Sequence, residues 1–186
     1  MKRIARNHIS LGMNISSSRA SLASLAVVIA SLGNPAVAEV VGADAAACSD
    51  PSAAAVRVHI TGFKTGDGSV RVQAYGSNPA DFLATGKWVR RVEVQLQGRR
   101  SLDVCLRLPH FGDYAVAVRH DANANRKSDW NDGGGFSRNP RLSLFHLKPA
   151  YADVAVTVSR DTPAIPIVMN YRQGFSIAPM RDAARR

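Results

Sequence analysis

Hydrophobic and polar residues alternate with a period of two in short runs along the chain. In residues 56–60, valine and isoleucine alternate with arginine and histidine, and residues 70–74 repeat the pattern after a glycine-rich turn at residues 65–68. Successive side chains of a strand point to opposite faces. The alternation therefore predicts a β-hairpin with one buried face and one wet face.

The same alternation recurs in five further runs, at residues 92–96, 102–108, 114–118, 154–158 and 165–171. No window of ten or more residues after residue 38 shows the period of an amphipathic helix. Short strands at this spacing are typical of a β-sandwich. We therefore predict an all-β, seven-stranded sandwich with one long loop between strands five and six. Pro163 and Pro166 place the last strand at a sheet edge, because proline cannot donate to a ladder.

The N-terminus has the layout of a secretory signal peptide. Basic residues precede an apolar run at residues 22–32, and residues 35–38 then read Pro-Ala-Val-Ala. This run is far shorter than the roughly 20 residues that a membrane-spanning helix needs. We therefore expect cleavage after Ala38, export to the periplasm or the cell exterior, and no stable membrane insertion. A lipoprotein signal at Cys48 is the alternative, although it lies well past the apolar run.

The exported chain divides into an N-terminal segment at 39–54, a sandwich domain at 55–171 and a basic C-terminal tail at 172–186. The whole sequence has a formal net charge of +10. A positively charged exported protein is attracted to anionic surfaces such as phosphorylated glycans or lipid head groups. An anionic envelope component is the candidate partner, no nucleic acid is expected, and the sequence does not identify a protein partner. The alternative is a solvated basic surface.

Cys48 and Cys105 are the two cysteines of the chain. An oxidising compartment favours their pairing. Cys105 has the opposite parity to the leucines of residues 102–108, so a bridge would lie on the outer face of that strand, with the N-terminal segment over it. Closing a loop of about 58 residues predicts a stabilisation of roughly 4 kcal/mol. Two free thiols are the alternative.

An oxygen-rich segment follows the fifth run. Side-chain oxygens occur at positions one, three, five, nine and twelve of a twelve-residue loop, the spacing of calcium ligands, in Asp121, Asn123, Asn125, Asp129 and Asp132. Arg126 stands where such a loop needs glycine, so any calcium affinity would be weak. Alternatively, these residues form Asx-turns that bind their own backbone, with Asp129 paired to Arg126 or Lys127.

Three polar residues nearby are expected to be structural. Tyr114 begins a strand two residues after a glycine, as in a tyrosine corner, where the phenol bonds upstream backbone; an ordinary half-buried tyrosine is the alternative. His120 continues the buried parity and is expected to bond a loop carbonyl. A catalytic arrangement of His120, Asp121 and Ser137 is the alternative. Because Ser137 lacks the flanks of a nucleophile elbow, we expect no enzyme.

Small residues leave room over the outer face of the fifth strand. Ala115 and Ala117 lie on that face, and we expect residues 121–149 to cover it. The three glycines at 133–135 predict a flexible turn. A ligand site could use the aromatic and basic residues of this segment, which are Trp130, Phe136, Arg138 and Arg141. Alternatively, the two aromatic residues form the loop's own core.

Three motifs together resemble a known family. They are Tyr-Ala-Val-Ala-Val at 114–118, His-Asp-x-Asn-x-Asn at 120–125 and Gly-Phe-Ser at 135–137. The string resembles the exported bacterial proteins called domain of unknown function 2141, over roughly residues 56–158. The resemblance implies an immunoglobulin-like or prealbumin-like sandwich in a bacterial envelope, with no established activity. The family pattern has glycine at the position of Arg126, and this departure weakens the calcium interpretation.

We therefore expect a non-enzymatic envelope protein of unestablished role, with a candidate weak calcium site in residues 120–132. A binding module for an anionic or glycan envelope ligand is the alternative.

Overall fold

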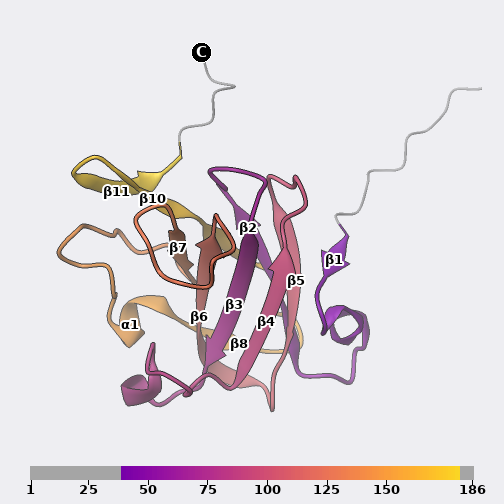
Figure 1. The fold of residues 1–186 in the computed structure, drawn as a ribbon. Helices are drawn as coiled ribbons and strands as arrows, with labels where there is room; N and C mark the ends of the chain where they lie inside the picture. The colour runs from indigo at the N-terminus through magenta and orange to yellow at the C-terminus, as the bar shows by residue number, and fades with distance from the viewer. Residues whose placement is uncertain (1–38, 181–186) are drawn as a thin grey trace, which may run out of the picture. The chain divides into compact units, whose positions relative to one another are not determined.

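Two β-sheets form the body of the protein in a computed structural model that describes residues 39–180 (Figure 1). The predicted signal peptide, residues 1–38, and the last residues of the predicted tail, 181–186, lie outside the described residues. The smaller sheet has the strand order β1 (Val40–Val41), β5 (Leu102–Arg107), β2 (Ala55–Thr61) and β9 (Ile165–Val168). No helix in residues 39–180 is long and apolar enough to cross a membrane.

The larger sheet is centred on a long strand, β6 (Gly112–Asp121). Its order is β11 (Ser176–Pro179), β10 (Asn170–Gln173), β7 (Gly133–Phe136), β6, β3 (Ser69–Tyr75) and β4 (Arg90–Gln95). A further strand, β8 (Ala155–Val158), pairs with the first half of β6. Three short helical segments complete the fold: η1 (Ala45–Ser49), η2 (Pro79–Asp81) and α1 (Tyr151–Val154). The prediction of an all-β domain is confirmed.

The core lies between the two sheets and follows the period-two pattern. Val58 of β2 and Val72 of β3 are fully buried, and both belong to one apolar cluster with strands of both sheets. The residues that alternate with these buried side chains along β2 and β3 face outward. Burying each such side chain contributes about 1.5–3 kcal/mol. Alternation in the sequence therefore identifies the inner faces correctly.

The last predicted strand, residues 165–171, divides between the sheets. Its first half, β9, pairs in parallel with β2 at the edge of the smaller sheet, where Pro166 needs no donor. At Met169 the backbone N–H bonds the carbonyl of Thr61 (2.9 Å), and the chain then enters β10 of the larger sheet. The edge position was predicted, but the division was not, because alternation continues through the crossing.

The glycine run at 133–135 forms strand β7, not the flexible turn that we predicted. A Cβ atom on Gly133 would lie 2.4 Å from Cε1 of Tyr171, and one on Gly135 would lie 2.7 Å from Cγ2 of Ile167. These glycines therefore let the strand approach the core closely. Gly134 faces outward, with no atom within 4 Å of the position of its Cβ. Strand β7 shortens the predicted long loop between β6 and β8.

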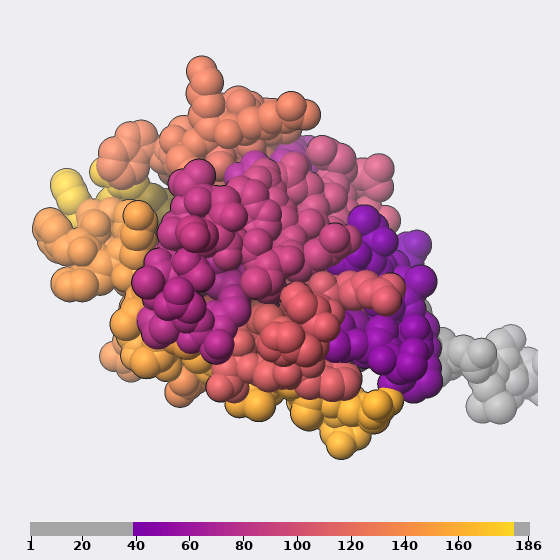
Figure 2. Space-filling view, turned by 90° about the horizontal axis from the view of Figure 1, so that it is seen from below, coloured from indigo at the N-terminus to yellow at the C-terminus, as the bar shows by residue number. Residues whose placement is uncertain are grey.

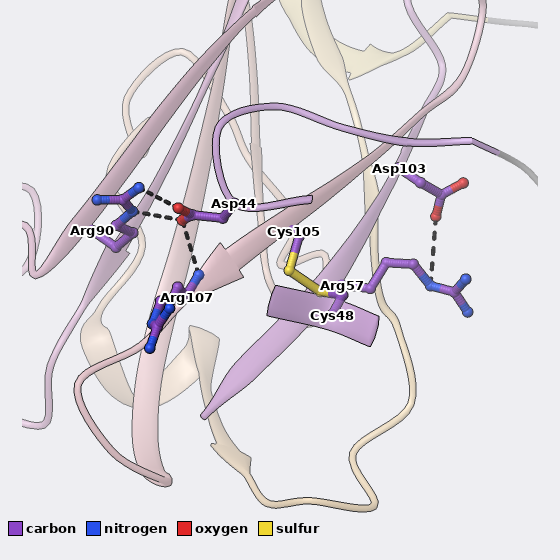
Figure 3. The surroundings of a disulfide bond; sticks show 7 residues. All are labelled: Asp44, Cys48, Arg57, Arg90, Asp103, Cys105 and Arg107. Atoms are coloured by element: carbon purple, nitrogen blue, oxygen red, sulfur yellow. Dashed lines mark hydrogen bonds and ion pairs between the residues drawn. A yellow bond between two sulfur atoms is a disulfide. The ribbon is translucent and has the colours of Figure 1, made fainter. Parts of the chain in front are cut away.

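A disulfide joins the N-terminal segment to the smaller sheet, as predicted (Figure 3). Cys48 of η1 bonds Cys105 of β5, with 5.8 Å between the Cα atoms. Beside it, the buried carboxylate of Asp44 accepts hydrogen bonds from the guanidinium of Arg90 (2.5 Å to Nε) and from the backbone N–H of Arg107 (2.9 Å). Asp44 and Cys105 are buried at this junction between the segment and the sheet.

Residues 172–179, assigned to a basic tail from the sequence, instead complete the hairpin of β10 and β11. Gly174 provides the left-handed backbone of its two-residue turn (φ 62°). The strands are only four residues each, too short for alternation to indicate them. The strands of the larger sheet therefore extend to Pro179.

Candidate functional site

The carboxylate of Asp121 is occupied by the backbone of its own loop. Its two oxygens accept hydrogen bonds from the N–H groups of Asn125 (3.1 Å) and Arg126 (2.7 Å). The side-chain oxygen of Asn123 also accepts from the Asn125 N–H, at 3.2 Å. The Asn123 bond spans two residues, as in an Asx-turn, whereas the Asp121 carboxylate bonds backbone four and five residues further along the loop.

Asp129 organises the second half of the loop in the same way. One carboxylate oxygen accepts from the side-chain amides of Asn123 (2.8 Å) and Asn125 (3.0 Å), and the other from the Asn131 N–H (2.9 Å). These hydrogen bonds hold the pKa of Asp129 below its usual value, the backbone bond from Asn131 being the largest cause. The alternative pairing of Asp129 with Arg126 or Lys127 is not what these contacts show.

An arginine of the sheet holds the end of the loop. The guanidinium of Arg119 donates to Asp132 at 2.9 Å and 3.2 Å, lies 3.7 Å from Asp121, and donates to the carbonyl of Lys127. Within residues 39–180, no three His, Cys, Asp or Glu side chains are grouped to hold a metal ion. Calcium would have to compete with this arginine and displace amide donors. The calcium site therefore stays a prediction, and the geometry indicates weak affinity.

His120 is fully buried, and both its ring nitrogens have partners. Nε2 lies 2.8 Å from the carbonyl of Asp67, so it donates, and Nδ1 accepts from the hydroxyl of Tyr171 (2.6 Å). Burial lowers the pKa of His120 and raises that of Tyr171 to about 12. This pair joins β6 to β10 inside the core.

Tyr114 and Ser137 also bond the backbone. The Tyr114 hydroxyl donates to the carbonyl of His110 (2.7 Å), the upstream bond of a tyrosine corner. The buried Ser137 hydroxyl donates to the carbonyl of Val154 and accepts from the Val116 N–H (3.0 Å). The hydrogen bonds of His120, Asp121 and Ser137 thus go to other groups and not to one another.

A pocket of about 650 Å³ lies over the outer face of the larger sheet. Its floor includes the small residues Ala117 of β6 and Gly134 of β7. Its walls come from residues 83–88, 128–132 and 142–148, and from strands β10 and β11. The loop after β6 therefore borders the pocket over this face of the sheet, instead of covering all of it.

Arginines from neighbouring strands line one side of this pocket. Arg71 of β3 lies opposite Arg119 of β6 on one side and Glu93 of β4 on the other. Like charges directly opposite destabilise a sheet. Here Glu93 accepts from Arg71 (2.6 Å) and Arg91 (3.0 Å to Nε), and those two hydrogen bonds, that from Arg91 foremost, hold the pKa of Glu93 low. Two guanidiniums share one carboxylate, so this side keeps a surplus positive charge.

Aromatic residues stand on two sides of the pocket, each beside an arginine. The guanidinium of Arg172 lies 3.9 Å from the ring centroid of Trp130, and that of Arg91 lies 5.1 Å from that of Trp88. A guanidinium stacked on a ring still presents its N–H edges to an anion. Trp130 remains 74% exposed, so its ring is also accessible to a ligand.

Two of the four ligand residues suggested by the sequence, Trp130 and Phe136, line the pocket. Arg138 instead donates to the carbonyl of Ala152 (2.9 Å), and neither it nor Arg141 is in the lining. The arginines in its lining, Arg71, Arg91, Arg119 and Arg172, all lie on strands of the larger sheet. Their outward parity was visible in the sequence, but their proximity depends on strand register.

A family model described as an uncharacterized protein conserved in bacteria, domain of unknown function 2141, matches residues 58–165. No curated protein and no solved structure matches the chain. The matched region includes the pocket floor and the oxygen-rich loop, whereas Arg172 lies beyond it.

Proposed function

The chain belongs to the family of uncharacterized bacterial proteins called domain of unknown function 2141, and on that premise we propose that it is an exported, non-enzymatic binding protein. Its ligand is an anionic or glycan component of the bacterial envelope. The observation that carries the proposal is the pocket over the larger sheet, whose lining combines the small residues Ala117 and Gly134 with the exposed side chains of Trp130 and Arg172.

The chemistry of the lining supports an anionic ligand. Arg172 and Lys148 form no ion pair within residues 39–180, and Arg71 and Arg91 share Glu93. A carboxylate or phosphate would complete their charge and accept bidentate hydrogen bonds from a guanidinium. The pocket volume is within the range of small-ligand sites, about 300–1,000 Å³. A sugar ring could lie on Gly134 and Ala117 and stack against Trp130.

The non-enzymatic part of the proposal is supported by the buried polar groups. His120 has no exposed surface, and its ring nitrogens are engaged by Tyr171 and Asp67. Ser137 is also fully buried and bonded to backbone. Neither side chain lines the pocket, so neither is in position to act on a molecule bound there.

Export is supported by the signal-like N-terminus together with the bond between Cys48 and Cys105. Structural disulfides are typical of oxidising compartments. We further propose an immunoglobulin-like or prealbumin-like sandwich as the fold class. The Tyr114 hydroxyl bond to the His110 carbonyl supports the immunoglobulin-like arrangement.

A substitution at the pocket floor tests the proposed function. In Gly134→Leu, the new side chain would fill the floor without meeting another atom at Cβ, so the fold is expected to persist. An array of acidic and neutral glycans would identify ligands of the wild type, and calorimetry would measure their affinity. We expect acidic glycans to bind and Gly134→Leu to weaken them at least tenfold, with an unchanged circular dichroism spectrum.

A charge-matched pair of variants supplies the control. Arg172→Gln removes a cation from the pocket, whereas Arg57→Gln removes one from the smaller sheet, where it lies 3.8 Å from Asp103. Only Arg172→Gln should reduce binding. Equal binding by wild type and Gly134→Leu, or no acidic glycan bound at all, would refute the pocket as the ligand site.

A further inference from the structure

Two tight turns hold phenylalanine side chains out into solvent. In residues 143–146, the backbone groups of Ser143 and His146 bond each other at 3.0 and 3.3 Å, and Phe145 lies in the turn between them. In the β10–β11 hairpin, Gln173 and Ser176 are the last paired residues, and Gly174 and Phe175 form the turn between them. Phe145 is 93% exposed and Phe175 is 95% exposed. We call these the two aromatic turns.

The two turns border the same region of the surface. Residues 142–148 and the β10–β11 hairpin both line the pocket, and both lie at the left of the molecule in Figures 1 and 2. Within residues 39–180, the large exposed apolar side chains are Val89, Trp130, Phe145, Leu147 and Phe175. All except Val89 belong to the aromatic turns or to the pocket lining. These side chains therefore lie in or next to the pocket lining and are not scattered singly over the surface, and we call them the patch.

The charged residues in the two chain segments that contain the aromatic turns are all basic. Residues 137–150 and 170–180 contain no acidic residue, but they contain Arg138, Arg141, Lys148 and Arg172. The last three of these are exposed and form no ion pair within residues 39–180. Apolar tips flanked by free cations match the interface of an anionic bilayer, where aromatic rings enter the boundary region and cations contact head groups.

We propose that the two aromatic turns dock the protein reversibly on an anionic phospholipid bilayer. Phe145 and Phe175 enter the boundary between head groups and acyl chains, and Arg141, Lys148 and Arg172 contact the head groups. A second copy of the chain is a poorer occupant, because a symmetric dimer through this patch would bring the two sets of free cations together. Two phenylalanines provide a weak contact, which further suits a reversible surface association.

Vesicle sedimentation tests this proposal with the chain beginning at Glu39. The probes are vesicles of 30% phosphatidylglycerol in phosphatidylcholine, vesicles of phosphatidylcholine alone, and soluble glycerol phosphate as competitor. The double variant Phe145→Ser/Phe175→Ser removes both tips, and Val89→Ser removes an exposed apolar side chain outside the patch. The melting temperature of the double variant is expected to match that of the wild type, because the two phenylalanines are almost fully exposed.

We expect the wild type and Val89→Ser to bind the anionic vesicles, with weaker binding at high salt and to neutral vesicles. The double variant should bind at least tenfold more weakly, since removing an apolar side chain from contact with lipid is worth about that factor. Glycerol phosphate should not displace the protein. Equal binding by the double variant, absence of vesicle binding, or loss of a vesicle-independent dimer in the double variant would overturn the proposal. Glycan binding, measured without lipid, is independent of each result.

Discussion

Substituting alanine for each of two adjacent glycines of β7 should change the free energy of unfolding in opposite directions. In Gly133→Ala the new Cβ would lie 2.4 Å from Cε1 and 2.6 Å from Cζ of Tyr171. That ring is 2% exposed, and its hydroxyl bonds His120 at 2.6 Å, so it cannot retreat without breaking this bond. In Gly134→Ala the methyl group meets nothing within 4 Å.

The expected magnitudes follow from these contacts. Overpacking costs about 1–3 kcal/mol, and loss of a buried hydrogen bond about 1 kcal/mol more. Gly133→Ala should therefore lower the free energy of unfolding by about 2–4 kcal/mol. Gly134→Ala should raise it by up to about 1 kcal/mol, because alanine reduces the entropy of the unfolded chain.

Thermal and urea denaturation of the two variants would measure the difference. A gap of about 3 kcal/mol corresponds to melting temperatures roughly 10 °C apart for a domain of this size. The Gly133→Ala/Tyr171→Phe double variant is informative, since without its hydroxyl the ring is free to move and part of the Gly133→Ala cost should disappear. Equal destabilisation by Gly133→Ala and Gly134→Ala would show that β7 does not face the core as described.

Three further measurements address other parts of the structure. Cys48→Ser/Cys105→Ser should lower the free energy of unfolding by roughly 4 kcal/mol, and reductant should do the same to the wild type but not to the variant; no change would mean that the bridge does not constrain the chain. Because burial lowers the pKa of His120, the unfolded state binds a proton more readily, so stability is complete above the unfolded pKa of about 6.5 and falls as the pH drops below it. Urea denaturation at a series of pH values from 7.5 to 5 should show the free energy of unfolding of the wild type falling with pH, and His120→Gln should show a smaller fall. An equal dependence on pH in the two proteins would contradict this role of His120. Calcium at 1 mM should raise the melting temperature by less than about 2 °C relative to chelator, since Arg119 already donates to Asp132; a larger rise, with heat of binding in calorimetry, would instead establish a strong site.

Local patterns in the sequence predicted the longer strands, though not β1, β7 or β11, and they predicted several individual bonds. Alternation at 56–60 and 70–74 identified the inward faces of β2 and β3, and the parity of Cys105 placed its bridge on the outer face of β5. Such features depend only on neighbouring residues, so they can be read along the chain.

Strand β7, formed by the glycine run, could not be predicted from local patterns. Gly133 and Gly135 carry no alternation, since they lack side chains, and their strand exists because Tyr171 and Ile167 occupy the space beside it. Those partners lie more than thirty residues away along the chain. Strand propensity therefore predicted a turn, whereas packing between distant segments required a strand with no side chains on its inner face.

The sequence by itself determined that the protein is built from short strands with one apolar face each, that its cysteines can pair, and that its loop after residue 120 carries turn-forming oxygens. Only the tertiary structure decided that Arg71 and Arg119 stand side by side, that Arg119 holds Asp132, and that Arg172 lies over Trp130. The reason is physical: side-chain parity is a property of each strand alone, but neighbourhood across a sheet depends on register and on the order in which distant strands pair.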